Sequence, residues 1–332
     1  MKNARTASSQ RLRGTHALVA VAAALMTCAA PAAEKVSLRV SWLMNVQNAG
    51  YVMAKEKGFY AKEGLDVSIM PGGPNINSTT MVASGQNTFG TNDVSAVLYG
   101  NAQDMNLAVV GACFQKSPAG VLSLAASGIR TPKDLEGKTL AYNEGGPWHY
   151  TRAMLAQAGV DMSKVRTVVA IGNEVLMNGT VQAKTAFVVN EPIALELQGY
   201  PTATLAAADY GVNAYAEVVF AQAKTVGAKP ELVRSFMRAT AQGWDYALKH
   251  QDEAVAAVLA LNPTLKPEQQ KRQLALQESF IRSAHTEQHG LCSFEPAKIG
   301  EAAQILTTYG GLKPGMAIEP MLHPQFADQR AR

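Results

Sequence analysis

Hydrophobic and polar positions alternate in two short segments near the start of the chain. In residues 36–42 and again in 65–69, every second residue is apolar, which is typical of a β-strand. The segment between them is helical in character but is interrupted by Gly58 and Gly64. Helices commonly end at a glycine because the left-handed backbone conformation carries no Cβ penalty there. The stretch GYVMAKEKGFYAKEGLDVSIMPGGP therefore predicts a helix, a strand and a glycine-rich loop in immediate succession.

Further helices and strands follow in two series. The first series predicts helices over 75–84 and 93–102 and strands over 87–90 and 107–112. The second series, from Leu122, predicts strands over 138–142, 165–171 and 185–189, with helices from Trp148 and over 191–198. The chain then becomes almost wholly helical from Pro230 to about Thr308, with a break at Asn262-Pro263 and an irregular tail after Gly310.

Alternation of strands and helices predicts mostly parallel sheets that are covered on both faces. The two series predict two α/β lobes, and no low-complexity linker separates them, so we expect the chain to cross between them through strands. Ligands of open α/β sheets bind at the carboxyl ends of the strands. The glycine-rich loops at those ends are thus the first place to look for a binding site.

The first 32 residues are expected to be a signal peptide and not part of the fold. Four basic residues precede an apolar run over 17–30, and Ala30-Pro31-Ala32 offers a cleavage site for export to the periplasm. The run is too short for a membrane anchor. A lipoprotein signal would use Cys28, but the residues before it fit that pattern poorly.

Charge and cysteine content narrow the function. Without the four basic residues of the signal segment, 26 basic residues face 26 acidic ones, so nothing in the remaining chain favours nucleic-acid binding. About 300 residues are enough for two domains. Cys113 and Cys292 remain, and an exported protein could join them in a disulfide or bury both as thiols. Both alternatives stay open at this stage.

Four segments carry a family resemblance: AKEKGFYAKEGLDVSI, SGQNTFGTND, GIRTPKDLEGKTLAY and VNEPIALELQGY. Together they resemble the periplasmic substrate-binding proteins of ABC importers, in the branch that contains SsuA, TauA and ThiY and the thiamine-pyrimidine-synthase-like domain. The resemblance implies a bilobal type II periplasmic-binding-protein fold, with two doubly wound lobes joined by hinge strands near 118–124 and 216–222. Residues 34–120 plus 217–332 would form lobe 1 and residues 121–216 lobe 2.

The resemblance also implies a partner and a mode of action. A monomer would close on a small molecule between its lobes and deliver it to an inner-membrane ABC permease with its ATPase. A sensor that uses the same fold without a transporter remains an alternative.

The candidate ligand contacts are residues at the strand ends of both lobes. They are Trp42, Asn45, Gln47, Gly73, Asn92, Asp93, Asn143, Gly146, Trp148, Tyr150, Glu191 and Tyr210. Trp42 shares the parity of the apolar strand positions, so it could equally belong to the core. Ligand clefts combine apolar walls with a few placed polar groups, and this set has that composition.

Charge on these loops favours one class of ligand. These loops carry five acidic residues but only one nearby arginine, Arg152. The acidic residues are Asp93, Glu144, Glu174, Glu191 and Asp209. An acidic, aromatic cleft suits a flat heterocycle that stacks on a ring and donates to a carboxylate. Several of these acids could instead simply face water.

Resemblance points to the same class. The combination of NAGYVMAKEKGFY, MPGGP and VNEP is more similar to the pyrimidine and riboflavin binders than to the sulfonate binders. We expect a thiamine-precursor pyrimidine or riboflavin, with Glu191 accepting N–H groups, Trp42 and Trp148 stacking, and Asn45 and Asn92 making amide contacts. The alternative is a sulfonate, taurine or nitrate anion.

Catalysis, a cofactor and a metal are not expected. Eukaryotic enzymes of the same fold that make the thiamine pyrimidine carry a CCCFC signature, whereas this chain has GACFQKS with one cysteine. The GKT at 137–139 lacks the glycine that a phosphate-binding loop needs. His285, His289 and Cys292 have a spacing that a metal could use, but a solvated helix end explains them more simply.

Overall fold

The computed structural model describes Met1 and residues 32–330. Residues from Ala33 onward pack as one compact unit, and all the strands and helices below belong to it. The segment predicted as a signal peptide lies outside the described residues, apart from its two end residues. Within the described part, no helix is both long and apolar enough to cross a bilayer.

The first five-stranded sheet has the order β2-β1-β3-β10-β4. Its strands are β1 (Glu34–Arg39), β2 (Leu65–Met70), β3 (Phe89–Asn92), β4 (Leu107–Phe114) and β10 (Ala216–Gln222). β1 runs parallel to β2 and β3, whereas β10 is antiparallel to both β3 and β4.

The second sheet has the order β7-β6-β8-β5-β9. Its strands are β5 (Ala119–Leu124), β6 (Thr139–Tyr142), β7 (Arg166–Val169), β8 (Ala183–Phe187) and β9 (Thr202–Ala206). β6 is parallel to β7 and β8, and β5 is antiparallel to β8 and β9. Four of the five strands in each sheet thus run in the same direction, which confirms the expectation of mostly parallel sheets, and the exceptions are β10 and β5, which run against both of their neighbours.

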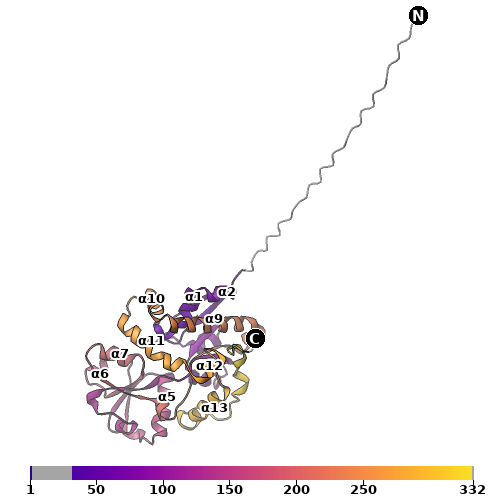
Figure 1. The fold of residues 1–332 in the computed structure, drawn as a ribbon. Helices are drawn as coiled ribbons and strands as arrows, with labels where there is room; N and C mark the ends of the chain where they lie inside the picture. The colour runs from indigo at the N-terminus through magenta and orange to yellow at the C-terminus, as the bar shows by residue number, and fades with distance from the viewer. Residues whose placement is uncertain (2–31, 331–332) are drawn as a thin grey trace. The chain divides into compact units, whose positions relative to one another are not determined.

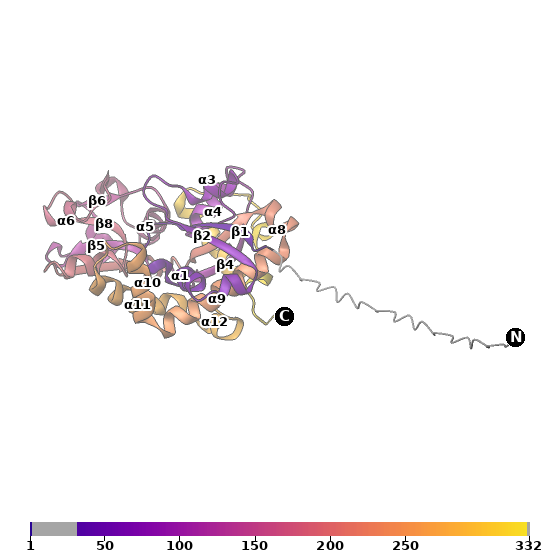
Figure 2. The same cartoon turned by 90° about the horizontal axis from the view of Figure 1, so that it is seen from above.

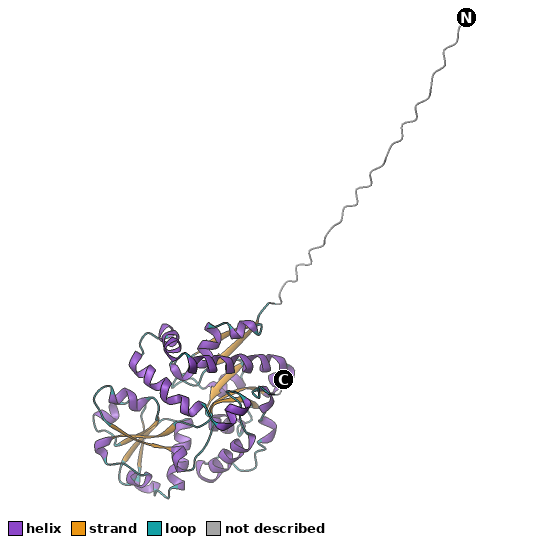
Figure 3. Ribbon diagram, in the orientation of Figure 1, coloured by secondary structure: helices purple, strands orange, loops and turns teal. Residues whose placement is uncertain are grey.

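The chain passes between the sheets twice, after β4 and before β10. The strands predicted near 118–124 and 216–222 are β5 and β10, which lie next to these crossings. Strands before residue 115 and after residue 215 belong to the first sheet, and the strands between belong to the second (Figures 2 and 3). The predicted lobe boundary at residue 120 falls inside β5, and the division into lobes remains a proposal.

Helices flank both groups of strands (Figure 3). With the first sheet are α1 (Ala49–Glu56), α2 (Phe59–Lys62), α3 (Ser78–Ala83), α4 (Val94–Asn101), α8 (Ala223–Ala228), α9 (Pro230–Lys249), α10 (Gln251–Leu261), α11 (Pro267–Ile281), α12 (Ala284–His289) and α13 (Pro296–Ile305). The second segment, which is the part of the chain between the two crossings, contains α5 (Gly146–Gln157), α6 (Glu174–Met177) and α7 (Glu191–Glu196).

The glycine-punctuated opening unit folds as predicted. α1 and α2 are separated at Gly58, and β2 starts after Gly64, with φ of 69° and 73° at these two glycines. The first strand is shorter than predicted, since β1 ends at Arg39 and Trp42 lies in the bend after it. β9, α6 and α8 were not predicted.

One hydrophobic core lies between the first sheet and the helices α1 and α9, which run side by side (Figure 1). Trp244 of α9 is fully buried there. A Cβ on Gly50 would lie 2.1 Å from its ring, and a Cβ on Gly243 would lie 2.2 Å from the Gly50 carbonyl oxygen. The close contact of the two helices therefore needs a residue without a side chain at both positions.

A second core cluster joins the two sheets. It contains Phe220 of β10 and Leu98 of α4 together with Val121 of β5 and Tyr150 of α5. Helix α5 belongs to the second segment by sequence, yet it packs against α4 of the first. α4 and α5 are thus held together by burial of apolar side chains beside the crossings.

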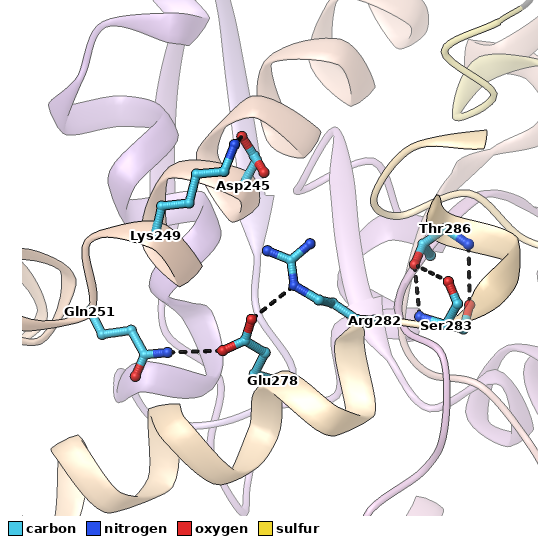
Figure 4. Close-up of polar contacts among 7 residues, drawn as sticks. All are labelled: Asp245, Lys249, Gln251, Glu278, Arg282, Ser283 and Thr286. Atoms are coloured by element: carbon cyan, nitrogen blue, oxygen red, sulfur yellow. Dashed lines mark hydrogen bonds and ion pairs between the residues drawn. The ribbon is translucent and has the colours of Figure 1, made fainter. Parts of the chain in front are cut away.

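The long helices are also linked by polar contacts (Figure 4). Glu278 of α11 accepts a hydrogen bond from Arg282 Nε at 2.8 Å and another from Gln251 Nε2, at the start of α10, at 3.0 Å. After Arg282 the chain turns, and Ser283 and Thr286 form a reciprocal capping box that begins α12 (Figure 4). These contacts keep α10 against α11 and end α11 where α12 begins.

Candidate functional site

Loops at the carboxyl ends of strands from both sheets surround one cavity of about 610 Å³. From the first sheet, the bend after β1, the glycine-rich loop after β2 and the end of β3 reach it. From the second sheet, the loops after β6 and β7, the end of β8 and the start of α7 reach it. This is the place at which the strand pattern predicts ligand binding.

The glycine-rich loop after β2 lies against the bend after β1. Gly72 N donates to Trp42 O at 2.9 Å, and a Cβ on Gly72 would lie only 2.4 Å from Val40 O. Gly73 and Pro74 then line the cavity. The glycine at position 72 thus permits a close approach of two backbones, which brings the loop and Trp42 to the same wall.

A buried carboxylate, Glu217 of β10, forms part of the cavity lining. Its Oε1 accepts from Ser41 Oγ at 2.6 Å and from Gln47 Nε2 at 2.7 Å. Burial raises the pKa of Glu217, while the polar side chains of Ser41, Thr91 and Gln47 around it act in the opposite direction. Three segments that are distant in sequence are joined at this one side chain.

Asp93 follows β3 and is a second buried carboxylate of the lining. Although it occupies the N-cap position of α4, its side chain makes no capping hydrogen bond. Burial raises the pKa of Asp93 well above its ordinary value, and the charge of Glu217 raises it further.

The opposite wall carries a carboxylate beside an amine. Glu191, the first residue of α7, accepts from Phe187 N at 3.1 Å. Burial raises the pKa of Glu191, and Lys184 nearby partly offsets this effect. Lys184 is itself buried in β8, and its ammonium donates to Ile171 O and to Asn173 Oδ1. The ammonium group of Lys184, a residue of the cavity lining, is therefore already hydrogen-bonded within the protein.

Aromatic and histidine side chains complete the wall. Trp42, Tyr99, His149 and Phe187 all line the cavity. The rings of Tyr99 and His149 lie 4.2 Å apart, and burial together with the charge of Arg152 lowers the pKa of His149 to about 4. His149 is therefore neutral at pH 7 and adds no positive charge.

Most of the residues predicted as ligand contacts lie in this lining. They are Trp42, Gln47, Gly73, Asn92, Asp93, Asn143, Gly146 and Glu191. The structure brings them together from both sides of the cavity. Their role in binding remains a proposal.

Four predicted residues lie outside the lining. Asn45 caps the turn Val46–Asn48, where its Oδ1 accepts from Gln47 N at 2.8 Å. Trp148 is 8% exposed and stacks on Tyr142 with ring centroids 4.3 Å apart. Its position near a helix start does not bring its ring into the cavity lining.

The other two lie near the crossing before β10. The Tyr150 hydroxyl is buried between α4 and α5, where it accepts from Ser95 N at 3.1 Å. Tyr210 ends the 3-10 turn Ala207–Tyr210 and is half-buried. Neither of these two side chains belongs to the lining.

Sequence reasoning missed Ser41, Glu217, Lys184, Tyr99 and His149. One signal was present, because Glu217 is an acidic residue inside the apolar strand AEVVFAQ. A carboxylate in a central strand must find partners or a function. Lys184 in the buried strand AKTAF carries the same kind of signal.

The histidines set aside earlier lie away from this cavity. His285 and His289 stack at 4.2 Å, and His289 Nδ1 lies 2.9 Å from Asp328 Oδ2. Among the described residues, no group of three His, Cys, Asp or Glu side chains could hold a metal ion.

Comparison with known proteins assigns the chain to a family. A family model described as NMT1/THI5 like matches residues 45–254. The chain belongs to the NMT1/THI5-like family. The match begins after β1 and ends within α10, and it includes both crossings and all of the cavity lining except Ser41 and Trp42.

Curated relatives of the chain include binding proteins and enzymes. The riboflavin-binding protein RibY of Chloroflexus aurantiacus is 29% identical over 77% of this chain and 73% of its own. The formylaminopyrimidine-binding protein of Halalkalibacterium halodurans is 27% identical over 69% of this chain and 71% of its own. The 4-amino-5-hydroxymethyl-2-methylpyrimidine phosphate synthase of Legionella pneumophila is 25% identical over 70% and 75%, respectively.

Solved structures of similar fold include periplasmic binding proteins. The alkanesulfonate-binding protein SsuA of Xanthomonas axonopodis pv. citri has a TM-score of 0.67, with 19% identity over 88% of this chain and 99% of its own. The periplasmic aliphatic sulphonate binding protein SsuA of Escherichia coli also has a TM-score of 0.67, with 17% identity over 87% and 92%. The predicted type II periplasmic-binding-protein fold is confirmed.

Proposed function

We propose that the chain is the exported solute-binding component of an ABC importer and that it captures a small nitrogen heterocycle in the cavity between its two sheets. A thiamine-precursor pyrimidine is the favoured ligand and riboflavin the second candidate. The observation that carries the proposal is the set of four carboxylates, Asp93, Glu144, Glu191 and Glu217, in a cavity that also presents aromatic rings and amide side chains.

The charge balance of the lining supports an N–H donor over an anion. Carboxylates accept hydrogen bonds and repel sulfonate or nitrate. Lys184 is the cationic partner on the opposite wall, and its ammonium already contacts Ile171 O and Asn173 Oδ1. Anion sites usually present arginines or several free N–H groups instead. The similarity to SsuA structures concerns the fold, and the sulfonate alternative therefore carries less weight.

The aromatic side chains support a flat ligand. Trp42, Tyr99 and Phe187 lie in the same lining as the carboxylates. Aromatic rings stack on heterocycles while carboxylates and amides read their edges. The riboflavin-binding and formylaminopyrimidine-binding relatives are named for ligands of this type.

An enzyme of pyrimidine synthesis is the competing proposal, because several curated relatives are named as such synthases. The single cysteine of GACFQKS in place of CCCFC and the predicted export segment favour binding. We therefore propose a binder without catalytic residues or a cofactor. Delivery to a membrane permease and location in the periplasm belong to the same proposal.

A thermal-shift and calorimetry panel tests the proposed function. The panel contains 4-amino-5-hydroxymethyl-2-methylpyrimidine, N-formyl-aminopyrimidine, riboflavin, taurine, an alkanesulfonate and nitrate. A heterocycle at about 100 times its Kd should raise Tm by roughly 5 °C or more. Mass spectrometry of the recovered compound should show it unchanged. A response to the anions alone, or chemical conversion of the bound heterocycle, would replace this function with one of its competitors.

A further inference from the structure

We propose that Asp93 and Glu217 form a donor subsite at the cavity wall, which takes the amino-bearing, protonatable edge of the ligand. The inference rests on the proposed function and deepens it, because it selects an aminopyrimidine over a flavin. It concerns a pair of side chains of which one, Glu217, lies in a strand that sequence reasoning did not connect with the site.

Strand pairing places the two carboxylates side by side. β10 and β3 are antiparallel, with Val218 opposite Asn92, so the next positions along the ladder are Glu217 and Asp93. The hydrogen bond from Val94 N to Tyr215 O, 3.3 Å long, continues the pairing beyond them. Both side chains line the cavity. A ligand group that reaches one carboxylate is therefore close to the other.

Each carboxylate keeps one oxygen without a protein partner. Asp93 is 4% exposed and Glu217 is 1% exposed. Asp93 Oδ1 and Glu217 Oε2 are buried and accept no hydrogen bond from the residues that the structure describes. An unpaired buried acceptor is costly, and a charged one more so. Because two such oxygen atoms lie in the lining of one cavity, we infer that a ligand supplies the missing N–H donors.

The backbone at Glu217 supports a functional reason for this placement. Its φ is 47°, in the left-handed region that side chains other than glycine rarely adopt. The conformation occurs within a buried strand and accompanies a carboxylate that is held by Ser41 and Gln47. Strained residues of this kind cluster at ligand sites, where the surrounding contacts maintain them.

The chemistry of the two candidate ligands differs at this subsite. A 4-aminopyrimidine has an exocyclic amino group beside a basic ring nitrogen, and in its protonated form it offers two parallel N–H groups to carboxylate oxygens. The pyrimidinedione edge of a flavin has one N–H flanked by two carbonyl oxygens. Those carbonyls would face the oxygens of Asp93 and Glu217 and repel them. The subsite therefore favours the amino compound.

Calorimetry with two matched probes tests the inference on the full chain. The probes are 4-amino-5-hydroxymethyl-2-methylpyrimidine and its analogue with a 4-oxo group in place of the amino group. The variants are Glu217→Gln and Asp93→Asn, each with an exposed control of the same chemical change, Glu268→Gln on α11 and Asp66→Asn on β2. Tm values of the free proteins show whether each variant is folded.

The expected result has two parts. The wild-type protein should bind the amino probe at least tenfold more tightly than the oxo probe, and each subsite variant should lose at least tenfold in affinity for the amino probe. The controls should match the wild type. Equal affinity of the wild type for the two probes, which needs no variant, would overturn the inference, as would folded subsite variants with unchanged affinity. Binding of riboflavin without the amino probe would also overturn it but would leave the proposed function standing.

Discussion

The carboxylate of Asp93 occupies the space that a side chain at Gly146 would need. A Cβ built on Gly146 would lie 1.7 Å from Asp93 Oδ2 and 2.6 Å from its Cβ. Asp93 follows β3 of the first sheet, whereas Gly146 begins α5 in the second segment. Both residues line the cavity, so a backbone position of one wall touches a carboxylate of the other.

Gly146→Ala should therefore push Asp93 away from α5. The aspartate side chain is short and buried, so it cannot move without disturbing the surrounding packing, and a loss of about 1–3 kcal/mol in the free energy of unfolding is expected. Ligand affinity should fall at least tenfold. Urea unfolding and calorimetry measure the two effects.

Gly300→Ala is the matched control for this substitution. Gly300 lies inside α13, and nothing would come within 4 Å of its Cβ. Alanine there should leave affinity unchanged and stabilise the helix by up to about 1 kcal/mol. If Gly146→Ala behaves like this control, the contact with Asp93 has no consequence for the site.

The stability of the ligand-free protein should fall as the pH rises through the raised pKa of Asp93. The native state retains a proton that the unfolded chain loses near the ordinary pKa of 3.8, so stability is greatest below this window and is lost as the native carboxyl ionises. Asp93→Asn removes this titration. The difference in Tm between the variant and the wild type should thus grow in the variant's favour as the pH rises above the ordinary pKa of 3.8.

The size of this difference should be a few degrees, since about 1 kcal/mol shifts Tm by roughly 2–4 °C in a protein of this size class. Thermal melts at matched ionic strength measure it. Asp66→Asn, an exposed change of the same kind, should run parallel to the wild type. Parallel curves for Asp93→Asn as well would mean that Asp93 titrates normally.

Local sequence signals predicted the parts of the fold that depend on local chemistry. Gly58 and Gly64 end their helices, and the order of strands and helices follows from the hydrophobic pattern. The direction of β5 and β10 depends instead on where the chain crosses between sheets. Periodicity is the same for parallel and antiparallel strands, so the pattern cannot distinguish them.

The site divides in the same way. Residues in loops at strand ends, such as Asn92 and Glu191, were found because the fold class itself predicts their location. Trp148 and Tyr150 were misplaced by the same rule, because the side of a helix that faces the cavity depends on packing. Glu217 was missed because it lies within a strand, and only the pairing of β10 with β3 brings it to Asp93.

His149 should make the protein acid-labile. Burial and the charge of Arg152 lower its pKa to about 4, so the native state holds the imidazole neutral while the unfolded chain accepts a proton near pH 6.5. This contribution is fully present above pH 6.5 and is lost as the pH falls toward 4. Its size is about 2–3 kcal/mol between these limits.

His149→Gln tests the contribution of this imidazole. Glutamine keeps a polar group near Ser95 Oγ, which lies 3.3 Å from His149 Nδ1, but it cannot be protonated. The variant should lose about 1 kcal/mol at pH 7 through the missing contact with Tyr99. It should lose less additional stability than the wild type between pH 6.5 and pH 4, as measured by urea unfolding. An identical pH profile would show that His149 does not titrate in this range.

Reduction of the Cys113–Cys292 disulfide should destabilise the protein without unfolding it. The bond joins residues that are 179 positions apart and ties β4 to the loop after α12. Cross-links over long loops typically contribute 2–5 kcal/mol, so Tm should fall by roughly 5–15 °C. The same loop is also held by hydrogen bonds from Ala112 N to Cys292 O and from Gln115 Nε2 to Ser293 O, both 2.8 Å long. These bonds do not depend on the oxidation state, so the fold should persist.

Thermal melts with and without reductant measure the shift, and the double variant C113A/C292A, which has no bond to break, should not respond to reductant. The bond would have no stabilising role if the wild-type Tm stayed unchanged in reductant although both thiols were shown to be free.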